Sequence, residues 1–238
     1  MADNKINTDS LVTGLGSHTI LSPDGYPVRP RTSAIPVVRK HHRAERPHRL
    51  LIMGPQGSGK GTQSKRLADA FAVPNISTGE IFRANIKAGT PLGQIAQRYT
   101  DHGELVPDEI TDSMVRERLS APDVVGGFIL DGYPRTEAQV RALDGMLADL
   151  GWKLDGVVEL TADREELLRR IAGRAGDEGR TDDTPAALTR RLELYANQTA
   201  PLTAEYAERG LLARVDGIGD VEGVTNRIIT ELDRIAAD

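Results

Sequence analysis

The chain has 238 residues, which is enough for one good-sized hydrophobic core with small inserted subdomains. At 39% hydrophobic and 27% charged residues, its composition is ordinary for a soluble protein. No apolar run approaches the length of a membrane span, and the polar start MADNKINTDS has no signal-peptide core, so we expect a cytoplasmic protein with no membrane partner. The absence of cysteine excludes disulfides and cysteine zinc sites.

The net charge of −5 is unevenly distributed along the chain. Residues 1–48 hold seven Lys/Arg against four Asp/Glu, whereas the remainder holds 23 against 31. General nucleic-acid binders need a basic face for the phosphate backbone. The acidic body therefore argues against nucleic acid as a partner.

Residues 1–48 differ in composition from the remainder of the chain, being rich in Pro, Ser, Thr and Arg without a sustained period. We expect an N-terminal extension that is largely disordered, and then a domain over 49–238. Turn residues at 22–26 would allow 19–21 to pair with 26–28 as a marginal hairpin. The basic cluster 39–43 is interpreted as a solvated tail, and contact with RNA, a polyphosphate or an acidic partner is the alternative.

The stretch from Leu50 to Gln63, LLIMGPQGSGKGTQ, changes abruptly from an apolar run to a glycine-rich loop and then to a helical pattern. Gly54 to Lys60 satisfies the spacing G-x-x-x-x-G-K, although Gly61 stands where Ser or Thr is usual and Thr62 comes one place later. Such a loop offers backbone N–H groups, a helix N-terminus and a lysine charge to a phosphate. The dinucleotide fingerprint fails at Thr62, and a plain glycine-rich turn remains the alternative.

From Arg49 onward strand and helix patterns alternate, which predicts an α/β fold with a five-stranded parallel sheet flanked by helices. The expected strands are 50–53, 75–77, 128–130, 156–160 and 212–215. A helix is expected over 61–71, and another from 78 that stops at 89–91. A second short helix follows to about 101, and Asp108 caps the next, over 108–119. The remaining helices are expected over 136–149, over 163–172, from 185 and from about 220. Residues 77–106 therefore form a small helical insertion rather than sheet.

A long helix is expected to open at Thr184-Pro185, with Thr as N-cap and Pro at the first position. Its stripe of Leu188, Leu192 and Tyr195 is expected to face the core, and Pro201 should bend or break it.

Asp131 comes directly after the buried strand 128–130, where an unpaired carboxylate would be costly. A Mg²⁺ ion held through water is its expected partner, and a loop aspartate capping its own turn is the alternative.

Arginines gather near the predicted strand ends and loops. Phosphoryl transfer needs many guanidinium donors around the transferring oxygens, and transfer between two phosphates needs no general base. Ordinary surface arginines paired with acids are the alternative for any single one. The arginines in question are Arg83, Arg135, Arg170, Arg174, Arg180 and Arg191.

Six stretches in order resemble the adenylate kinase family, which has the P-loop NTPase fold, and the resemblance covers about residues 49–238. They are GPQGSGKGTQ (54–63), ISTGEIFRA (76–84), GELVPDE (103–109), GFILDGYPRT (127–136), RIAGR (170–174) and GRTDD (179–183). The resemblance implies reversible phosphoryl transfer from MgATP to AMP, giving two ADP.

The resemblance also implies roles for individual residues. The ATP phosphates would be cradled by Gly57, Ser58, Gly59, Lys60, Gly61 and Thr62, with Arg170 and Arg174. AMP would be held by Thr78, Arg83, Arg135 and Gln139, with Arg180 and Arg191. Residues with a catalytic role would be Lys60, Arg135, Arg170, Arg174, Arg180, Arg191 and Asp131, the last ordering the magnesium shell through water.

The lid implied by the resemblance is short, over residues 173–183, with Asp182 and Asp183 helping to fasten it, and 77–106 would be the AMP-binding insertion. We therefore expect Mg²⁺ with ATP, no structural zinc and a monomer. The alternatives are a UMP/CMP kinase, whose relatives typically have Ala in place of Thr78 and Asn in place of Thr136, or a P-loop regulatory protein that binds nucleotide without efficient transfer. A mere binder has no need of the whole arginine set.

Overall fold

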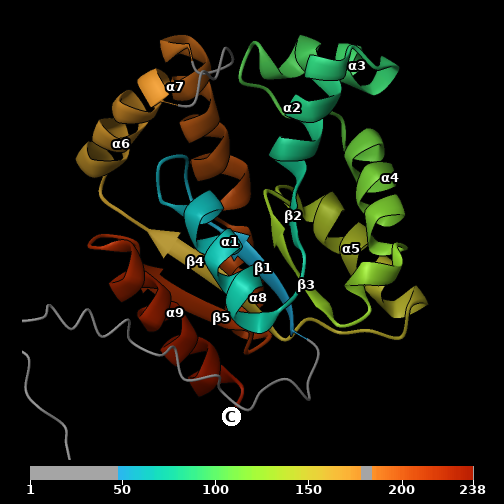
Figure 1. Ribbon diagram of the computed structural model, residues 1–238, viewed down its shortest axis with the longest axis vertical. Coiled ribbons are helices and arrows are strands. Elements are labelled where there is room, and N and C mark those ends of the chain that lie inside the picture. Colours follow the sequence, from blue (N-terminus) through green and yellow to red (C-terminus); the bar gives the residue numbers. More distant parts are fainter. Residues whose placement is uncertain (1–47, 178–183, 238) are drawn as a thin grey trace, which may run out of the picture. The chain divides into compact units, whose positions relative to one another are not determined.

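The computed structural model describes residues 48–177 and 184–237, and of 174–177 only the backbone. The expectations for residues 1–47 and 178–183 fall outside these ranges. Within the described residues, five strands form one parallel sheet in the order β2-β3-β1-β4-β5 (Figure 1). They are β1 (His48–Met53), β2 (Asn75–Ser77), β3 (Gly127–Asp131), β4 (Gly156–Thr161) and β5 (Leu212–Asp216). The predicted α/β fold and its P-loop NTPase arrangement are confirmed.

The centres of the three middle strands are buried and apolar because helices cover both of their faces: LLIM in β1, FIL in β3 and VV in β4. Strand β1 lies between β3 and β4, with Leu50 opposite Ile129 on one side and Gly156 on the other. The helices that come after β1 and β3 pack on opposite faces, so the chain leaves the two strands in opposite directions and a crevice forms beyond their carboxyl ends, where such folds place ligands.

One face of the sheet is covered by α1 (Lys60–Phe71) and α9 (Val221–Ile235), the other by α4 (Asp108–Leu119), α5 (Glu137–Asp149) and α8 (Leu202–Glu208). Leu67 of α1 and Ile228 of α9 are fully buried on the first face. Leu143 of α5 and Tyr206 of α8 are fully buried on the second. The sheet is thus the rigid middle layer from which the loops at its carboxyl edge project.

Two helices, α2 (Thr78–Ala88) and α3 (Pro91–Thr100), lie between β2 and α4 and pack against each other (Figure 1). Gly89 ends α2 in the left-handed conformation, at φ +66°. The Thr90 hydroxyl caps α3 by accepting from the Gly93 N–H at 3.0 Å. The stop expected at 89–91 is therefore confirmed.

Asp108 is not the cap of α4, and that expectation is wrong. Pro107 holds the cap position, and Asp108 is the first helical residue. The Asp108 carboxylate instead accepts from the Thr136 hydroxyl at 2.8 Å and from the Gln139 side-chain amide at 2.6 Å. These stronger partners on α5 take the side chain away from its own backbone.

The long helix predicted from Thr184 is present but changes its winding. Thr184 caps α7 (Pro185–Leu194) as expected, and a π-helical turn, η2 (Tyr195–Thr199), leads to Pro201, where the chain breaks before α8. The Ala200 N–H donates to the Tyr195 carbonyl five residues earlier, at 2.8 Å.

Other bounds moved by a few residues. Helix α6 runs over Arg164–Asp177 rather than ending at 172, and a short 3₁₀ turn, η1, covers Pro122–Val124. The stripe of Leu188, Leu192 and Tyr195 is only half-buried, because α7 borders a cleft on one side. None of the helices in the described ranges is both long and apolar enough to cross a bilayer.

Two helical glycines provide a matched test of the packing between α2 and α3. A Cβ at Gly93 would lie 2.2 Å from the Asn85 carbonyl oxygen, whereas one at Gly145 on α5 would meet nothing within 4 Å. We expect Gly93→Ala to destabilise the domain by about 1–3 kcal/mol through overpacking. Gly145→Ala should instead stabilise it by up to about 1 kcal/mol through helix propensity.

Urea unfolding of both variants measures these changes in the free energy of unfolding. Equal midpoints for the two variants would show that α2 and α3 do not pack at this glycine.

Candidate active site

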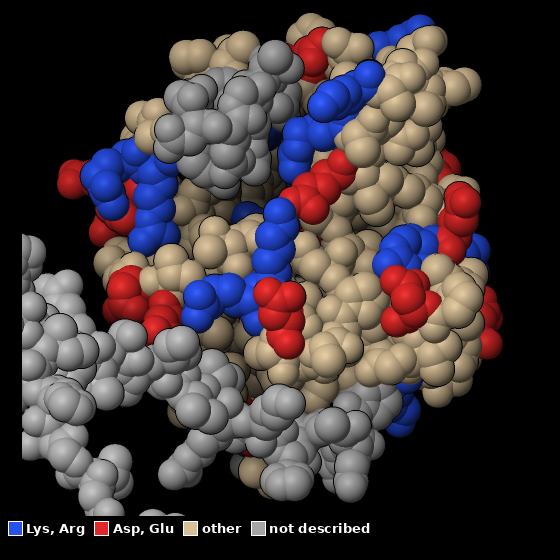
Figure 2. Space-filling view, viewed as in Figure 1, with Lys and Arg blue, Asp and Glu red and all other residues tan. Residues whose placement is uncertain are grey.

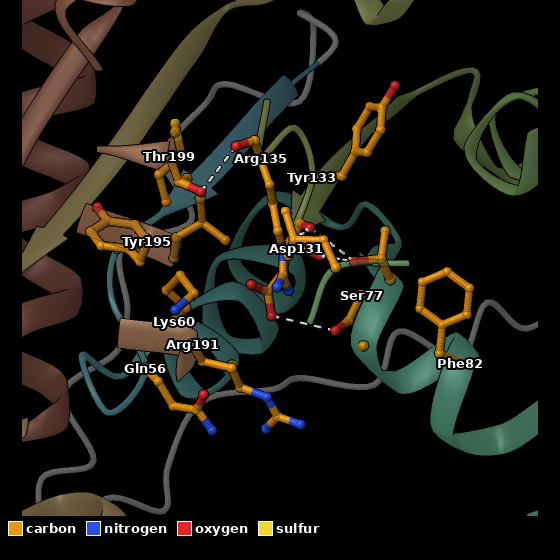
Figure 3. A pocket seen from close by; sticks show the side chains of 18 of the residues that line it. Gln56, Lys60, Ser77, Phe82, Asp131, Tyr133, Arg135, Arg191, Tyr195 and Thr199 are labelled. Carbon is orange, nitrogen blue, oxygen red and sulfur yellow. Dashed lines mark hydrogen bonds between the residues drawn. The ribbon is translucent and has the colours of Figure 1, made fainter. Parts of the chain in front are cut away.

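A cleft opens at the carboxyl edge of the sheet, where β1 and β3 end. Figure 2 shows this face hollowed, with Lys or Arg side chains within the hollow and on either side of it. Most residues singled out from the sequence line this cleft (Figure 3): Gly57, Gly59, Lys60, Gly61, Thr78, Arg83, Asp131, Arg135, Gln139 and Arg191. Segments far apart in the sequence are thus brought to one place.

The glycine loop between β1 and α1 packs directly on backbone. A Cβ at Gly54 would lie 2.5 Å from the Leu160 carbonyl oxygen, and one at Gly57 would lie 2.8 Å from that of Leu167. Both glycines have positive φ, +145° and +87°. Only glycine therefore fits, and the loop is held against β4 and α6 with the N-terminus of α1 at its end.

Helix α1 begins at Lys60, so the N–H groups of its first turn lack carbonyl partners within the helix and carry the positive end of its dipole. The Lys60 ammonium bends over the loop and donates to the Pro55 carbonyl at 2.9 Å. Gly59 and Gly61 line the cleft beside it. This arrangement is suited to the phosphate chain of a nucleotide.

Asp131 ends β3 inside the cleft and is 9% exposed. The Ser77 hydroxyl donates to its carboxylate at a long 3.4 Å, and the Arg135 side chain reaches down beside it (Figure 3). In the described residues no group of three or more His, Asp or Glu side chains gathers as a metal cage. A single carboxylate fits a Mg²⁺ ion that keeps its waters and takes phosphate oxygens as its other ligands.

Three guanidinium groups reach the cleft from different elements: Arg83 from α2, Arg135 after β3, and Arg191 from α7. Burial lowers the pKa of Arg135, the nearby Arg191 and Arg83 charges lower it further, and Asp131 opposes them. Like charges held this close favour an anionic ligand.

Backbone carbonyls orient two of these three guanidinium groups. The Arg135 Nε donates to Gly132 at 2.7 Å, and the Arg191 Nη2 donates to Thr100 at 3.1 Å. A Cβ at Gly79 would lie 3.2 Å from Nη1 of Arg83, so that side chain lies along the first turn of α2. The cations are thus positioned before any ligand binds, which is favourable for binding phosphate.

The far wall of the cleft is apolar and ends in an amide. Phe82 and Val106 are buried in this wall, and Gln139 is 2% exposed. The side-chain carbonyl of Gln139 accepts from the backbone N–H of Arg135 at 2.7 Å, while the Thr78 hydroxyl donates to the backbone carbonyl of Gly132 at 3.0 Å. A slot with an apolar wall and a few polar groups at its end is typical of a site for a base.

Three predicted residues do not line the cleft. Ser58 is buried, and Thr62 is exposed on α1. Arg170 lies beside the glycine loop, with Nη1 3.8 Å from where a Gly59 Cβ would be, and its Nε donates to Glu166 at 2.6 Å. Hydrogen bonds from Arg169 and Arg170 lower the pKa of Glu166 to about 2.

The other residues predicted for the lid fall outside the described parts of the chain. These are the side chain of Arg174 and all of Arg180, Asp182 and Asp183.

Sequence reasoning missed several residues of the site. Tyr195 and Thr199 of η2 line the cleft, and the Thr199 hydroxyl donates to the Arg135 carbonyl at 3.1 Å. Outside the cleft lining, sequence reasoning also missed a pair on neighbouring strands, in which the buried Glu159 accepts from Arg214 at 2.7 Å. A charged residue inside the run VVEL is a signal for this pair, but no local pattern marks the π turn.

Comparison with known proteins agrees with this site. The family model described as "Adenylate kinase" matches residues 52–211. The chain is 58% identical over 187 residues to the adenylate kinase of Nocardioides sp., covering 79% of this chain and 98% of that one. It is 57% identical over 185 residues to that of Bifidobacterium longum, covering 78% and 100%. It is 56% identical over 186 residues to that of Kocuria rhizophila, covering 78% and 99%.

The family model extends over the glycine loop and the cleft arginines, and the relatives are covered almost end to end. The chain belongs to the adenylate kinase family.

Proposed function

We propose that the chain catalyses reversible phosphoryl transfer from MgATP to AMP, giving two ADP. The observation that carries this proposal is the convergence of Lys60, Arg83, Arg135 and Arg191 on one cleft, between a glycine loop and an apolar slot. The glycine loop is a place for the phosphate chain of one nucleotide, and the apolar slot is a place for the base of the other. Two nucleotides therefore fit, with their phosphates between the loop and the slot.

The ATP phosphates lie on the glycine loop, bound by the N–H groups of Gly57, Gly59 and Gly61 and by the Lys60 ammonium. Ser58 belongs to the loop, Thr62 lies in the first turn of α1, and Arg170 flanks the loop. Mg²⁺, when bound, neutralises charge on the phosphate oxygens, and Asp131 orders its water shell.

AMP occupies the apolar slot, with Gln139 and Thr78 at its base and the guanidinium groups of Arg83 and Arg135 on its phosphate. An oxygen of that phosphate attacks the γ-phosphorus of ATP, and the bond to the bridging oxygen of ADP breaks. Arg191 faces the transferred group, and Arg174 and Arg180 are proposed to join it from the lid. No proton has to be removed, so no general base is required.

Water must be excluded, because it would otherwise accept the phosphoryl group. We propose that residues 77–106, the AMP-binding insertion, and residues 173–183, a short lid, close over the nucleotides. Arg191 on α7 already donates to Thr100 at the end of α3, so the two sides of the cleft contact each other across it. We further propose a monomer of the cytoplasm that needs no structural zinc and no nucleic acid.

A coupled assay of ADP formation tests the proposal, with ATP, Mg²⁺ and each of AMP, UMP, CMP and GMP as acceptor. We expect AMP to support the fastest turnover, because the family match and Thr78 both favour it over the pyrimidine monophosphates. Preference for UMP or CMP would establish the alternative kinase, and ATP hydrolysis that ignores AMP would establish a nucleotide-binding protein of another class.

Removing single cations from the cleft tests the assignment of the site. Lys60→Ala and Arg135→Ala should each lower kcat by about 100-fold or more, because each removes charge stabilisation of the transferring oxygens. Arg116→Ala is the matched control, since Arg116 is exposed on α4 and its guanidinium pairs with the exposed Asp149. Near-normal turnover of either cleft variant, with thermal unfolding unchanged, would refute its role.

A further inference from the structure

We propose that Asp108 is a specificity-determining residue, which acts by holding the Gln139 side-chain amide in one orientation and so decides which base edge the slot accepts. The inference rests on the proposed function, because it concerns the acceptor nucleotide of that reaction. Asp108 itself is a positioning residue and acts through Gln139.

The two residues are joined across two helices. The Gln139 Nε2 donates to Oδ1 of Asp108 at 2.6 Å, and Oε1 of Gln139 accepts from the Arg135 N–H at 2.7 Å. The other carboxylate oxygen of Asp108 accepts at 2.8 Å from the hydroxyl of Thr136, which is the residue that caps α5. Both oxygens of Asp108 are therefore occupied, and the carboxylate is fixed against the N-terminus of α5.

The chemistry of these partners leaves the amide one way to lie. A carboxylate only accepts hydrogen bonds and a backbone N–H only donates them. Turning the amide over would place its oxygen against the Asp108 carboxylate and its NH₂ against the Arg135 N–H. Two bonds would become two repulsive contacts in a buried site, so the orientation is set by Asp108 and by the Arg135 backbone together.

Each end of the locked amide keeps one further bonding position, a second N–H on Nε2 and a second lone pair on Oε1. Gln139 lines the cleft at the end of the apolar slot. The amide therefore offers a donor and an acceptor in fixed order. The adenine edge presents an acceptor, N1, beside a donor, the exocyclic amine. Hypoxanthine has nearly the same shape but presents a donor, N1–H, beside an acceptor, O6.

A free amide would turn over to suit either base, and the locked one does not. Asp108 thus disfavours hypoxanthine by making the turned amide unfavourable, rather than by adding a contact to adenine.

The test compares AMP with IMP as acceptors in the full chain, by the ratio of their kcat/KM values. In Asp108→Asn the side chain can donate to a turned Gln139 oxygen, so the part of the penalty that Asp108 imposes is removed and only the contact with the Arg135 N–H still opposes turning. We expect the AMP-to-IMP ratio to fall by about tenfold or more, with the KM for ATP unchanged. Asp108→Ala, which removes the acceptor without adding a donor, should also lower the ratio.

Glu109→Gln is the matched control, since Glu109 is the next acid on α4 and is exposed. It should keep the wild-type ratio. Thermal unfolding of each variant identifies any that fails to fold, and the ratio is then taken from the other substitution of Asp108. Folded Asp108 variants in which both acceptors slow equally, or not at all, would overturn the inference. Failure of the wild-type chain to use AMP would instead refute the proposed function.

Discussion

Three guanidinium groups and an ammonium lie around a half-enclosed cleft, and the repulsion among these like charges is the constraint that the rest of the structure has to meet. The pKa of Arg135 is lowered mainly by its burial, and the repulsion from Arg191 and Arg83 lowers it further. A chain that keeps such groups together before a ligand arrives must orient each of them by other means. Here the carbonyls of Gly132, Thr100 and Pro55 accept from Arg135, Arg191 and Lys60 in turn. Binding of phosphate then relieves the repulsion without first having to order the side chains.

The sheet supplies the rigidity for this arrangement. Strands β1 and β3 are neighbours with fully buried centres. The glycine loop follows β1, and the segment from Asp131 to Arg135 lies at the end of β3. The glycine loop is packed against β4 and α6 so closely that a methyl group at Gly54 or Gly57 would meet backbone. The π turn η2 adds Tyr195 and Thr199 to the wall that Arg191 begins. Secondary-structure ends, rather than long loops, therefore hold nearly all the described parts of the site.

Much of this could be predicted from the sequence because the signals are local. The strand, glycine loop and helix of residues 50–63, the buried run before Asp131, and the cap and proline at 184–185 are each visible within a few residues. Features that depend on a distant partner could not be predicted. The sequence favours Asp108 as a helix cap because capping is a local role, and only the packing of α4 on α5 gives it Gln139 and Thr136 instead. The run VVEL marks Glu159 as unusual, but its pairing with Arg214 likewise depends on the order of the strands.

The central claim is that two nucleotides bind end to end, with their phosphates between the glycine loop and the arginines of the slot. Calorimetric titration with one molecule that joins two adenosines through a chain of five phosphates measures this directly. We predict one-to-one binding that is far tighter than that of ATP or AMP alone, and we expect Arg135→Ala to lose most of this advantage over ATP. An affinity no greater than that of ATP, or one that Arg135→Ala leaves unchanged, would contradict it.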